Sequence, residues 1–289
     1  MILPTILACI VGIFAVYVLK STTTPAESDA TLGSGTMFDS IAPYYDSANK
    51  FMSLGFDQSW RRSLVDELDL KVDDIILDIS TGTGDVAIWI AKRMQSLGKN
   101  DGQPITGFDP SSKMLSFAAI KIEEGNYSGL IKLIEGDAQN MDSLNSDTYT
   151  KVSQSFGIRN VPDRMKALRE IYRVMRADGK VIIMEFATPL SGLLAPLAKV
   201  FLHNLVPLLG SLVSGGHNAE YDHLRDSILN FPSPAGFTQM MTDSGFSECI
   251  HKDLFFDVVH LFICHKRVVV EEVIEETIIF DEQEIFVEV

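Results

Sequence analysis

The stretch Leu77-Asp78-Ile79-Ser80-Thr81-Gly82-Thr83-Gly84-Asp85 decides the fold of this chain. It joins a short apolar run, residues 73–79, to a segment with helical periodicity, residues 86–94. A buried strand that runs into a glycine-rich turn and then a helix is typical of a nucleoside-binding βαβ unit. The two glycines allow a tight turn and the close approach of a ligand. Alone, the pattern fits a dinucleotide, another nucleoside cofactor or merely a tight turn.

The same alternation continues along the chain. Strands are predicted at 105–108, 131–134, 151–156 and 180–186, helices at 59–70, 113–123 and 164–175, and a late strand pair within 250–265. Strands that alternate with helices predict a mostly parallel sheet whose ligands bind beyond the carboxyl ends of the strands. The expected fold class is therefore α/β, a Rossmann-like sheet with helices on both faces.

Composition narrows the possible functions. The chain has 289 residues, 46% of them hydrophobic, and a net charge of −15 from 24 basic and 39 acidic residues. Such a charge argues against a nucleic-acid partner, because binding to phosphates rests on lysine and arginine. The three cysteines, Cys9, Cys249 and Cys264, have no metal-ligand spacing. Neither a metal site nor a disulfide framework is expected.

The two ends of the chain differ from its middle. Residues 1–20 hold a long uncharged, apolar run followed by Lys20, which predicts an N-terminal hydrophobic helix. We interpret it as a membrane anchor, with a cleaved signal segment or a buried helix as alternatives. Residues 21–36 have the composition of a flexible linker, residues 37–266 form the predicted main domain, and residues 267–289 form an acidic tail with eight acids.

Acidic residues near the predicted strand ends distinguish between a phosphate-bearing dinucleotide and a cationic nucleoside cofactor. Asp78 and Asp85 flank the glycine turn, where they would repel a pyrophosphate and favour a cationic ligand. S-adenosylmethionine carries a sulfonium and an ammonium and no phosphate. Asp109 ends the second strand, where a carboxylate can accept hydrogen bonds from both ribose hydroxyls. Asp137 and Ala138 follow the third strand, where they can enclose the adenine.

Several stretches together resemble the ubiquinone/menaquinone biosynthesis C-methyltransferases, a family of class I S-adenosylmethionine-dependent methyltransferases. The resemblance covers about residues 37–266. It is carried by Met37-Phe38-Asp39-Ser40-Ile41-Ala42, Tyr45-Asp46-Ser47-Ala48-Asn49, Trp60-Arg61-Arg62, the segment 77–85, Ser155-Phe156-Gly157-Ile158-Arg159-Asn160-Val161, Ala167-Leu168-Arg169-Glu170 and residues 221–228. It implies a class I methyltransferase sheet and cofactor contacts from Thr83, Asp109, Asp137, Ala138 and Ser155, beside Asp78, Gly82, Gly84 and Asp85 of the turn.

The reaction that this resemblance implies moves a methyl group onto a ring carbon of a prenylated quinol, a reaction that requires the ring to become phenolate-like. Arg159 is the first catalytic candidate, because a permanent cation can hold a phenolate oxygen or polarise a water. Asn160, Tyr45 and Asp46 are candidates for orienting the quinol or taking its proton. For each of the four, a structural role is the alternative. The dispersed histidines His217, His223 and His260 are expected to be structural.

Alternatives to this function remain open at the level of sequence. The polar stretch 140–150 and Phe255-Phe256-Asp257 depart from the family pattern. They leave open a methyltransferase for another lipid or small molecule, or a non-catalytic scaffold in a membrane complex. The expected partners are a prenylated quinol, a membrane through residues 1–20, and a quinone-biosynthesis complex or a second copy of the chain. The expected location is a single-pass membrane protein, by family analogy in the mitochondrial inner membrane.

Overall fold

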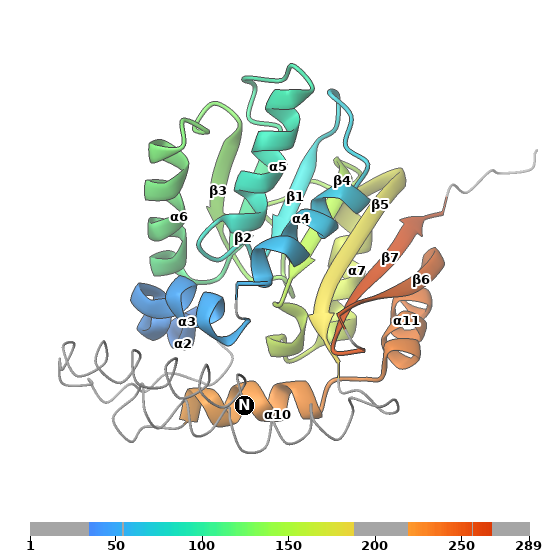
Figure 1. Ribbon diagram of the computed structural model, residues 1–289. Coiled ribbons are helices and arrows are strands. Elements are labelled where there is room, and N and C mark those ends of the chain that lie inside the picture. Colours follow the sequence, from blue (N-terminus) through green and yellow to red (C-terminus); the bar gives the residue numbers. More distant parts are fainter. Residues whose placement is uncertain (1–34, 54, 188–218, 256, 268–289) are drawn as a thin grey trace, which may run out of the picture.

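The computed structural model of the chain describes residues 35–53, 55–187, 219–255 and 257–267, which form one seven-stranded sheet flanked by helices (Figure 1). The strand order is β3-β2-β1-β4-β5-β7-β6. The strands are β1 (Ile76–Ile79), β2 (Ile105–Asp109), β3 (Ile131–Glu135), β4 (Tyr149–Ser155), β5 (Met175–Phe186), β6 (Phe246–Phe255) and β7 (Val259–Lys266). The first five are parallel, whereas β7 runs antiparallel to β5 and β6 antiparallel to β7.

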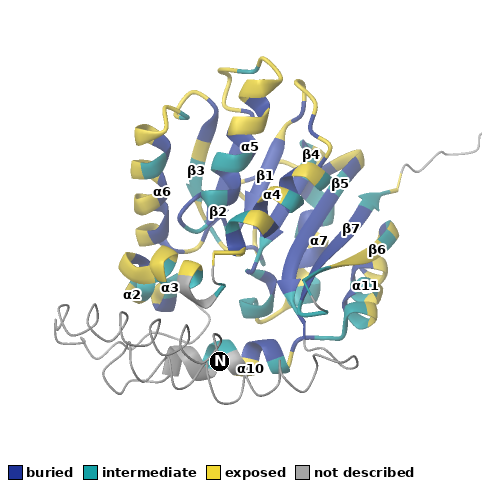
Figure 2. Ribbon diagram, in the orientation of Figure 1, coloured by how far each residue is buried: buried dark blue, intermediate teal, exposed yellow. Residues whose placement is uncertain are grey.

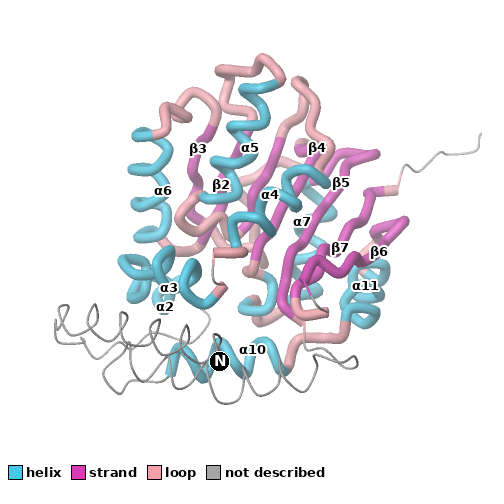
Figure 3. The backbone as a smooth tube through the Cα atoms, viewed as in Figure 1, coloured by secondary structure: helices cyan, strands magenta, loops and turns pink. Residues whose placement is uncertain are grey.

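The helices lie on both faces and at one edge of this sheet (Figure 3). They are α2 (Gly35–Ile41), α3 (Tyr45–Met52), α4 (Asp57–Glu67), α5 (Asp85–Ser96), α6 (Ser112–Glu124), α7 (Arg164–Val174), α10 (Ala219–Leu229) and α11 (Pro234–Asp243), with short 3₁₀ helices η1 (Ala42–Tyr44) and η2 (Ile158–Asn160). The expected α/β sheet with helices on both faces is therefore confirmed. The structure adds that the sheet is mixed, because the last two strands are antiparallel.

Alternation along the strands builds two apolar cores. In β5, Ile183 packs with the α7 and α11 side, while its neighbour Ile182 packs with the α4 and α5 side, and both are fully buried. A strand buried on both faces reads as a continuous apolar run, which is why residues 180–186 were identifiable from sequence. Figure 2 shows the central strands as the most deeply buried part of the molecule.

Two expectations about the chain are wrong. No helix within residues 35–53, 55–187, 219–255 and 257–267 is both long and apolar enough to cross a membrane, so the prediction of a single-pass membrane protein, mitochondrial or otherwise, is withdrawn. Residues 1–34 and 268–289 lie outside the described residues; they hold the expected N-terminal helix, the predicted linker up to residue 34 and the acidic tail from residue 268. Gly35 and Thr36, the last two residues of the predicted linker, are the first residues of α2. Second, Cys249 and Cys264 form a disulfide between β6 and β7. Spacing alone did not reveal it, because the pairing of these strands brings the two sulfurs together.

Candidate functional site

The predicted site residues converge on the carboxyl edge of the parallel strands. The segment 80–85 follows β1, Asp109 ends β2, Asp137 follows β3 and Ser155 ends β4. The sheet order reverses between β1 and β4, since β2 lies on one side of β1 and β4 on the other. Ligands of open α/β sheets bind at such a switch point. We call the strands β1, β2 and β3 with their following turns the β1–β3 half, and β4, η2, β5, α7, α10 and β7 the β4–β7 half.

The turn after β1 has the backbone that its glycines predict. Gly82 and Gly84 have φ angles of 54° and 85°. The Gly82 amide donates a hydrogen bond to Asp109 Oδ2 at 2.8 Å, so the turn is fastened to the tip of β2. A Cβ on Gly82 would meet nothing within 4 Å, so open space for a ligand adjoins the turn. Because Asp109 occupies the Gly82 amide, this turn offers less to a phosphate than a free backbone cradle would.

The β1–β3 half contains two buried aspartates, one in β1 and one at the end of β2. Asp78, 1% exposed, accepts hydrogen bonds from the Thr81 hydroxyl at 2.6 Å and the Ser153 hydroxyl at 2.7 Å. Burial raises its pKa to about 6 against the lowering effect of these bonds. Asp109, 5% exposed, accepts from the amides of Ser111 and Gly82, and burial likewise raises its pKa to about 6. Both carboxylates are therefore mostly ionised at neutral pH.

The remaining predicted cofactor residues complete the edge. Asp137 is exposed and accepts hydrogen bonds from the backbone and side chain of Gln139, while Ala138 beside it is buried. The Ser155 hydroxyl is buried and has no hydrogen-bond partner among the described residues. The structure thus brings together the predicted contacts on four adjacent strands, with one polar group free to bind a ligand.

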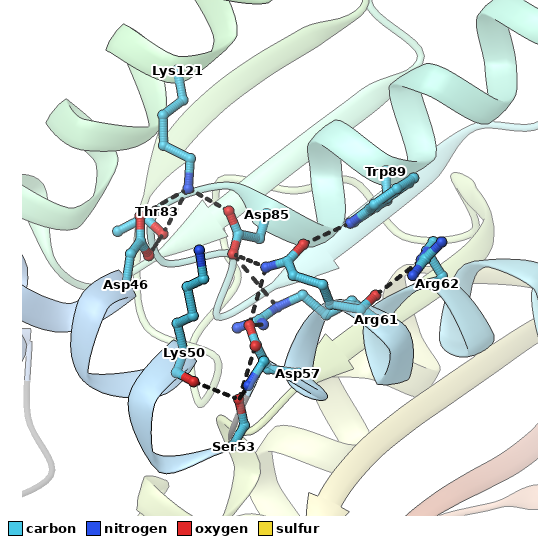
Figure 4. Close-up of polar contacts among 12 residues, drawn as sticks. Asp46, Lys50, Ser53, Asp57, Arg61, Arg62, Thr83, Asp85, Trp89 and Lys121 are labelled. Atoms are coloured by element: carbon cyan, nitrogen blue, oxygen red, sulfur yellow. Dashed lines mark hydrogen bonds and ion pairs between the residues drawn. The ribbon is translucent and has the colours of Figure 1, made fainter. Parts of the chain in front are cut away.

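An ion network fastens the N-terminal helices to the turn (Figure 4). The Thr83 hydroxyl donates to Asp46 Oδ1 at 2.6 Å, and Lys121 Nζ of α6 contacts Asp46 Oδ2 at 3.0 Å, Thr83 Oγ1 at 3.2 Å and the Asp85 carboxylate. Asp46, predicted as a catalytic residue, therefore lies at the cofactor turn. Arg61 adds a second cation, with its Nε 3.8 Å from Asp85 Oδ2.

Asp85 is consequently paired with cations of the protein. Burial raises its pKa, but Arg61 and Lys121 together outweigh that effect, and the pKa is lowered overall. A cationic ligand gains less from Asp85 than the sequence suggested, because its charge is already compensated. Gln58 of α4 extends the network: its Nε2 donates to Asp85 Oδ2 at 3.0 Å, and its Oε1 accepts from Trp89 Nε1 at 3.0 Å (Figure 4).

Arg159, the first catalytic candidate, forms a buried ion pair. Its Nη1 donates to Glu185 Oε1 at 2.9 Å and to the Phe156 carbonyl at 2.6 Å, and its amide donates to Glu185 Oε2 at 3.2 Å. Side-chain exposure is 9% for Arg159 and 0% for Glu185. The structural alternative, an arginine paired with an acid, is thus realised with Glu185. Within the part of the chain that the structure describes, the Arg159 Nε has no hydrogen-bond partner, so it can donate to a ligand.

Asn160 and Tyr45 differ in their surroundings. Asn160 Oδ1 lies 3.1 Å from His223 Nε2 of α10, and Asn160 Nδ2 is buried with no hydrogen-bond partner in the described ranges. Tyr45 packs edge-on against Phe38, with ring centroids 6.3 Å apart. An aromatic cluster lies beside Arg159: the rings of Phe156 and Phe186 stack at 4.5 Å, and Trp60 contacts both. The β4–β7 half therefore combines polar atoms with flat apolar surfaces.

Buried polar atoms without partners distinguish this half from the other. Among the described residues, they belong to β4, η2, α7 and β7: Gln154 Oε1, Ser155 Oγ, Arg159 Nε, Asn160 Nδ2, Arg164 Nε and both ring nitrogens of His260. An unsatisfied buried polar group costs about 1–3 kcal/mol, and such groups in a native fold call for an explanation. A bound polar molecule at the carboxyl edge would supply partners for those that face it.

Sequence reasoning gave Lys121 and Glu185 no role in the site and expected His223 to be structural. Lys121 lies in an ordinary amphipathic helix, and Glu185 lies near the end of an apolar strand, where a buried acid is unusual enough to have been a signal. His223 lies within the stretch 221–228 that carries the family resemblance, but nothing in that stretch indicates a contact with Asn160. These residues reach the site through contacts between elements that are distant in sequence.

The donor set fits a nucleoside cofactor that has hydroxyls and no phosphate. Asp109 presents a carboxylate next to open space at Gly82, and the small buried Ala138 leaves room at the tip of β3. A carboxylate suits a ribose diol, whereas it repels a phosphate. S-adenosylmethionine meets this description.

Comparison with known proteins places the chain in context. The sequence matches the ubiE/COQ5 methyltransferase family over residues 27–266. It is 36% identical over 230 residues to a ubiquinone/menaquinone biosynthesis C-methyltransferase UbiE of Geotalea daltonii, a match that covers 80% of this chain and 94% of the relative. It is 37% identical over 229 residues to a demethylmenaquinone methyltransferase of Thermotoga maritima, covering 78% and 93%.

A solved structure supports the fold independently. The crystal structure of a SAM-dependent methyltransferase from Aquifex aeolicus superposes with a TM-score of 0.53 at 14% sequence identity, covering 78% of this chain and 97% of that chain. At this identity the likeness concerns the fold, which is that of class I methyltransferases. Both the family and the fold imply S-adenosylmethionine as the cofactor.

Proposed function

Because the chain belongs to the ubiE/COQ5 methyltransferase family, we propose that it methylates a ring carbon of a prenylated benzoquinol or naphthoquinol. It is an S-adenosylmethionine-dependent C-methyltransferase of quinone biosynthesis. The single observation that carries this conclusion is the family match across the whole described sheet, from α2 to β7. Since the chain is an enzyme, the scaffold alternative has no remaining support.

The cofactor is held by the β1–β3 half together with Ser155 at the end of β4 in this proposal. Asp109 accepts hydrogen bonds from the ribose hydroxyls, Ala138 and Asp137 enclose the adenine, and Thr83 and Ser155 contact the methionine end. Gly82 and Gly84 keep the turn close to the ligand, and Asp78 braces it through Thr81. S-adenosylmethionine, when bound, supplies an electrophilic methyl group on a sulfonium.

The acceptor lies in the β4–β7 half in this proposal. An aromatic ring with hydroxyls fits a region that has stacked phenylalanines next to buried donors without partners. A neutral arene carbon is a poor nucleophile, and charge on a ring oxygen makes it a better one. Arg159 stabilises that charge electrostatically, since its guanidinium is fixed by Glu185 and its Nε is free to donate. Tyr45 and Asp46 close the site from the side of α3.

The decisive experiment is methylation of defined quinols by the purified chain. We expect a demethylmenaquinol or a demethylated benzoquinol, supplied with S-adenosylmethionine, to give a product heavier by one methylene unit in mass spectrometry. Arg159→Ala should greatly lower this turnover, while Arg62→Ala, on an exposed face of α4, serves as the matched control. Turnover of another lipid or small molecule, with none of any quinol, would contradict the proposal.

A cellular measurement identifies the ring. Cells that lack the protein should accumulate a quinone intermediate one methyl group short, and its ring and prenyl length name the substrate. Unchanged quinone intermediates in these cells would also contradict the proposal.

A further inference from the structure

One side chain in the β4–β7 half has a position that no sequence motif predicted. His223 lies on α10, the helix that crosses near the carboxyl edge of the sheet (Figure 1), and its Nε2 is 3.1 Å from Asn160 Oδ1. The charged groups that act on it are Asp226 of its own helix and Arg159 of η2. The imidazole therefore lies at the point where the acceptor is proposed to bind.

The surroundings of His223 keep its ring uncharged. Burial, and then the positive charge of Arg159, lower the pKa of His223 below 6.5, and Asp226 opposes this only partly. A neutral imidazole can accept a proton, whereas a charged one cannot. At neutral pH His223 is thus in the form that a general base requires.

Its hydrogen bond also selects one ring nitrogen. Because a carbonyl oxygen only accepts, Asn160 Oδ1 favours the tautomer in which Nε2 carries the hydrogen, and Nδ1 keeps its lone pair. The other end of Asn160, Nδ2, is a buried donor without a partner. One asparagine thus orients the base and offers a hydrogen bond to a bound molecule.

The other ionisable groups named for this site are unsuited to the same task. Arg159 is held by Glu185 and the Phe156 carbonyl, and a guanidinium has no acceptor site for a proton. Glu185 is fully buried, and both of its oxygens already accept hydrogen bonds, from Arg159 and from the amide of Phe186. The Asp46 carboxylate already accepts hydrogen bonds from Thr83 and Lys121.

We propose that His223 is the proton acceptor for a ring hydroxyl of the methyl acceptor, and that Asn160 is the positioning residue that holds its imidazole in the reactive tautomer. This inference rests on the proposed function, because it assumes a hydroxylated ring as acceptor. It assigns to Arg159 the stabilisation of the oxyanion and to His223 the transfer of the proton.

The proton transfer to His223 conserves atoms and charge. The hydroxyl O–H bond breaks, a new N–H bond forms at Nδ1, and the electron pair stays on oxygen and flows into the ring. The ring carbon then bonds to the methyl group as the bond from that methyl to the sulfonium sulfur breaks, which leaves the sulfur as a neutral thioether. That ring carbon loses its own proton to solvent and aromaticity returns. The oxygen then takes back the proton from His223, which leaves the imidazole neutral. The net change at the protein is zero, and one proton is released.

Variants of His223 test the assignment in turnover. We expect His223→Gln to lower kcat by about 100-fold or more with little change in KM, since glutamine can still hydrogen-bond to Asn160 but cannot take the proton. The acidic limb of the wild-type pH profile, set by the His223 pKa below 6.5, should disappear. Added imidazole should partly restore His223→Ala. The matched control is His251→Ala, because His251 is exposed on β6 and contacts Thr238. Full activity in His223→Gln would overturn the inference.

A second measurement does not depend on turnover. Absorbance of p-nitrophenol, whose phenolate is coloured, reports whether the bound phenol loses its proton. We expect the wild-type protein to shift this ionisation to lower pH, and His223→Gln to shift it less. An equal shift in both proteins, or no binding of the phenol, would overturn the inference. A shift that requires His223 in a protein that methylates no quinol would support the inference and contradict the proposed quinol substrate.

Discussion

The two halves of the carboxyl edge differ in whether their polar groups have hydrogen-bond partners within the protein. In the β1–β3 half, Asp78, Asp109 and Thr83 each have protein partners at hydrogen-bonding distance. In the β4–β7 half, buried polar atoms of Ser155, Asn160 and Arg164 have none in the described structure. The first half is preorganised before any ligand binds, whereas the second half keeps hydrogen-bonding capacity in reserve.

This difference has a physical meaning for an enzyme with two ligands. A preorganised pocket binds a constant cofactor with little reorganisation. Unsatisfied buried donors cost stability in the free protein, and they regain it when the acceptor supplies their partners. Natural folds retain such local costs chiefly at functional sites.

Arg159→Ala should give the largest effect. It leaves the fully buried Glu185 without its hydrogen-bonded arginine, and removing one partner of a buried ion pair destabilises a fold by about 3–5 kcal/mol. The measurement is urea unfolding, and Arg159→Met combined with Glu185→Gln should recover much of the loss. If Arg159→Ala unfolds like the wild type, the ion pair is not formed and the contrast between the halves loses its main support.

Asp109→Asn tests the β1–β3 half. We expect it to weaken S-adenosylmethionine binding about 100-fold, or 2–3 kcal/mol, because an amide cannot accept two hydrogen bonds from the ribose as a carboxylate does. Calorimetry measures this directly. Asp101→Asn, in an exposed loop beyond α5, is the matched control. Unchanged affinity in Asp109→Asn would remove Asp109 from the cofactor site.

Two serines of β4 provide the sharpest contrast, because the Ser153 hydroxyl has a hydrogen-bond partner and the Ser155 hydroxyl has none in the described structure. Ser153→Ala removes the hydroxyl that donates to Asp78 and should cost about 1–3 kcal/mol of stability. Ser155→Ala removes a buried hydroxyl that has no partner in the described structure, so it should not destabilise the free protein and should stabilise it by up to about 1–3 kcal/mol. Only the second should act mainly on ligand binding. Equal losses of stability in thermal unfolding would contradict the distinction.

Acidification should weaken cofactor binding. The pKa of Asp109 is raised to about 6, and its carboxylate must be ionised to accept from the ribose, so the Kd should rise up to about tenfold per pH unit below 6, or 1.4 kcal/mol. Acidification acts on folding in the opposite direction. Because the pKa of Asp109 is higher in the folded than in the unfolded state, this carboxyl stabilises the folded state at low pH, and that stabilisation is lost as the pH rises through 6. Calorimetry at pH 5 and pH 7 checks the first effect, and Asp109→Asn should have a flatter profile.

Lys121→Met should give the smallest effect. It removes the cation that joins Asp46, Thr83 and Asp85. Because the Lys121 side chain is partly exposed, its ion pairs contribute only about 1 kcal/mol to the stability of the fold. We expect a few-fold higher KM for S-adenosylmethionine and faster amide exchange in α3. Lys113→Met, on the same helix and exposed, is the control. An identical KM in both variants would show that α3 is not fastened through Lys121.

Much of the β1–β3 half was predictable from sequence. The glycine turn, its flanking strand and helix, and the acid at the end of β2 lie within about 35 residues of one another, and short-range sterics and periodicity specify them. The β4–β7 half was predicted in outline only. Arg159 was identified, but Glu185, 26 residues away, was not recognised as its partner.

The sequence by itself determined the parallel sheet, the edge at which ligands bind and the chemistry of the cofactor half, because those features depend on local backbone preference and on which faces of strands are apolar. Only the tertiary structure decided that Lys121 joins Asp46 to Asp85, that His223 meets Asn160 across 63 residues, and that Cys249 bonds to Cys264. Such contacts depend on strand order, register and helix packing, and no local pattern of residues encodes those distances.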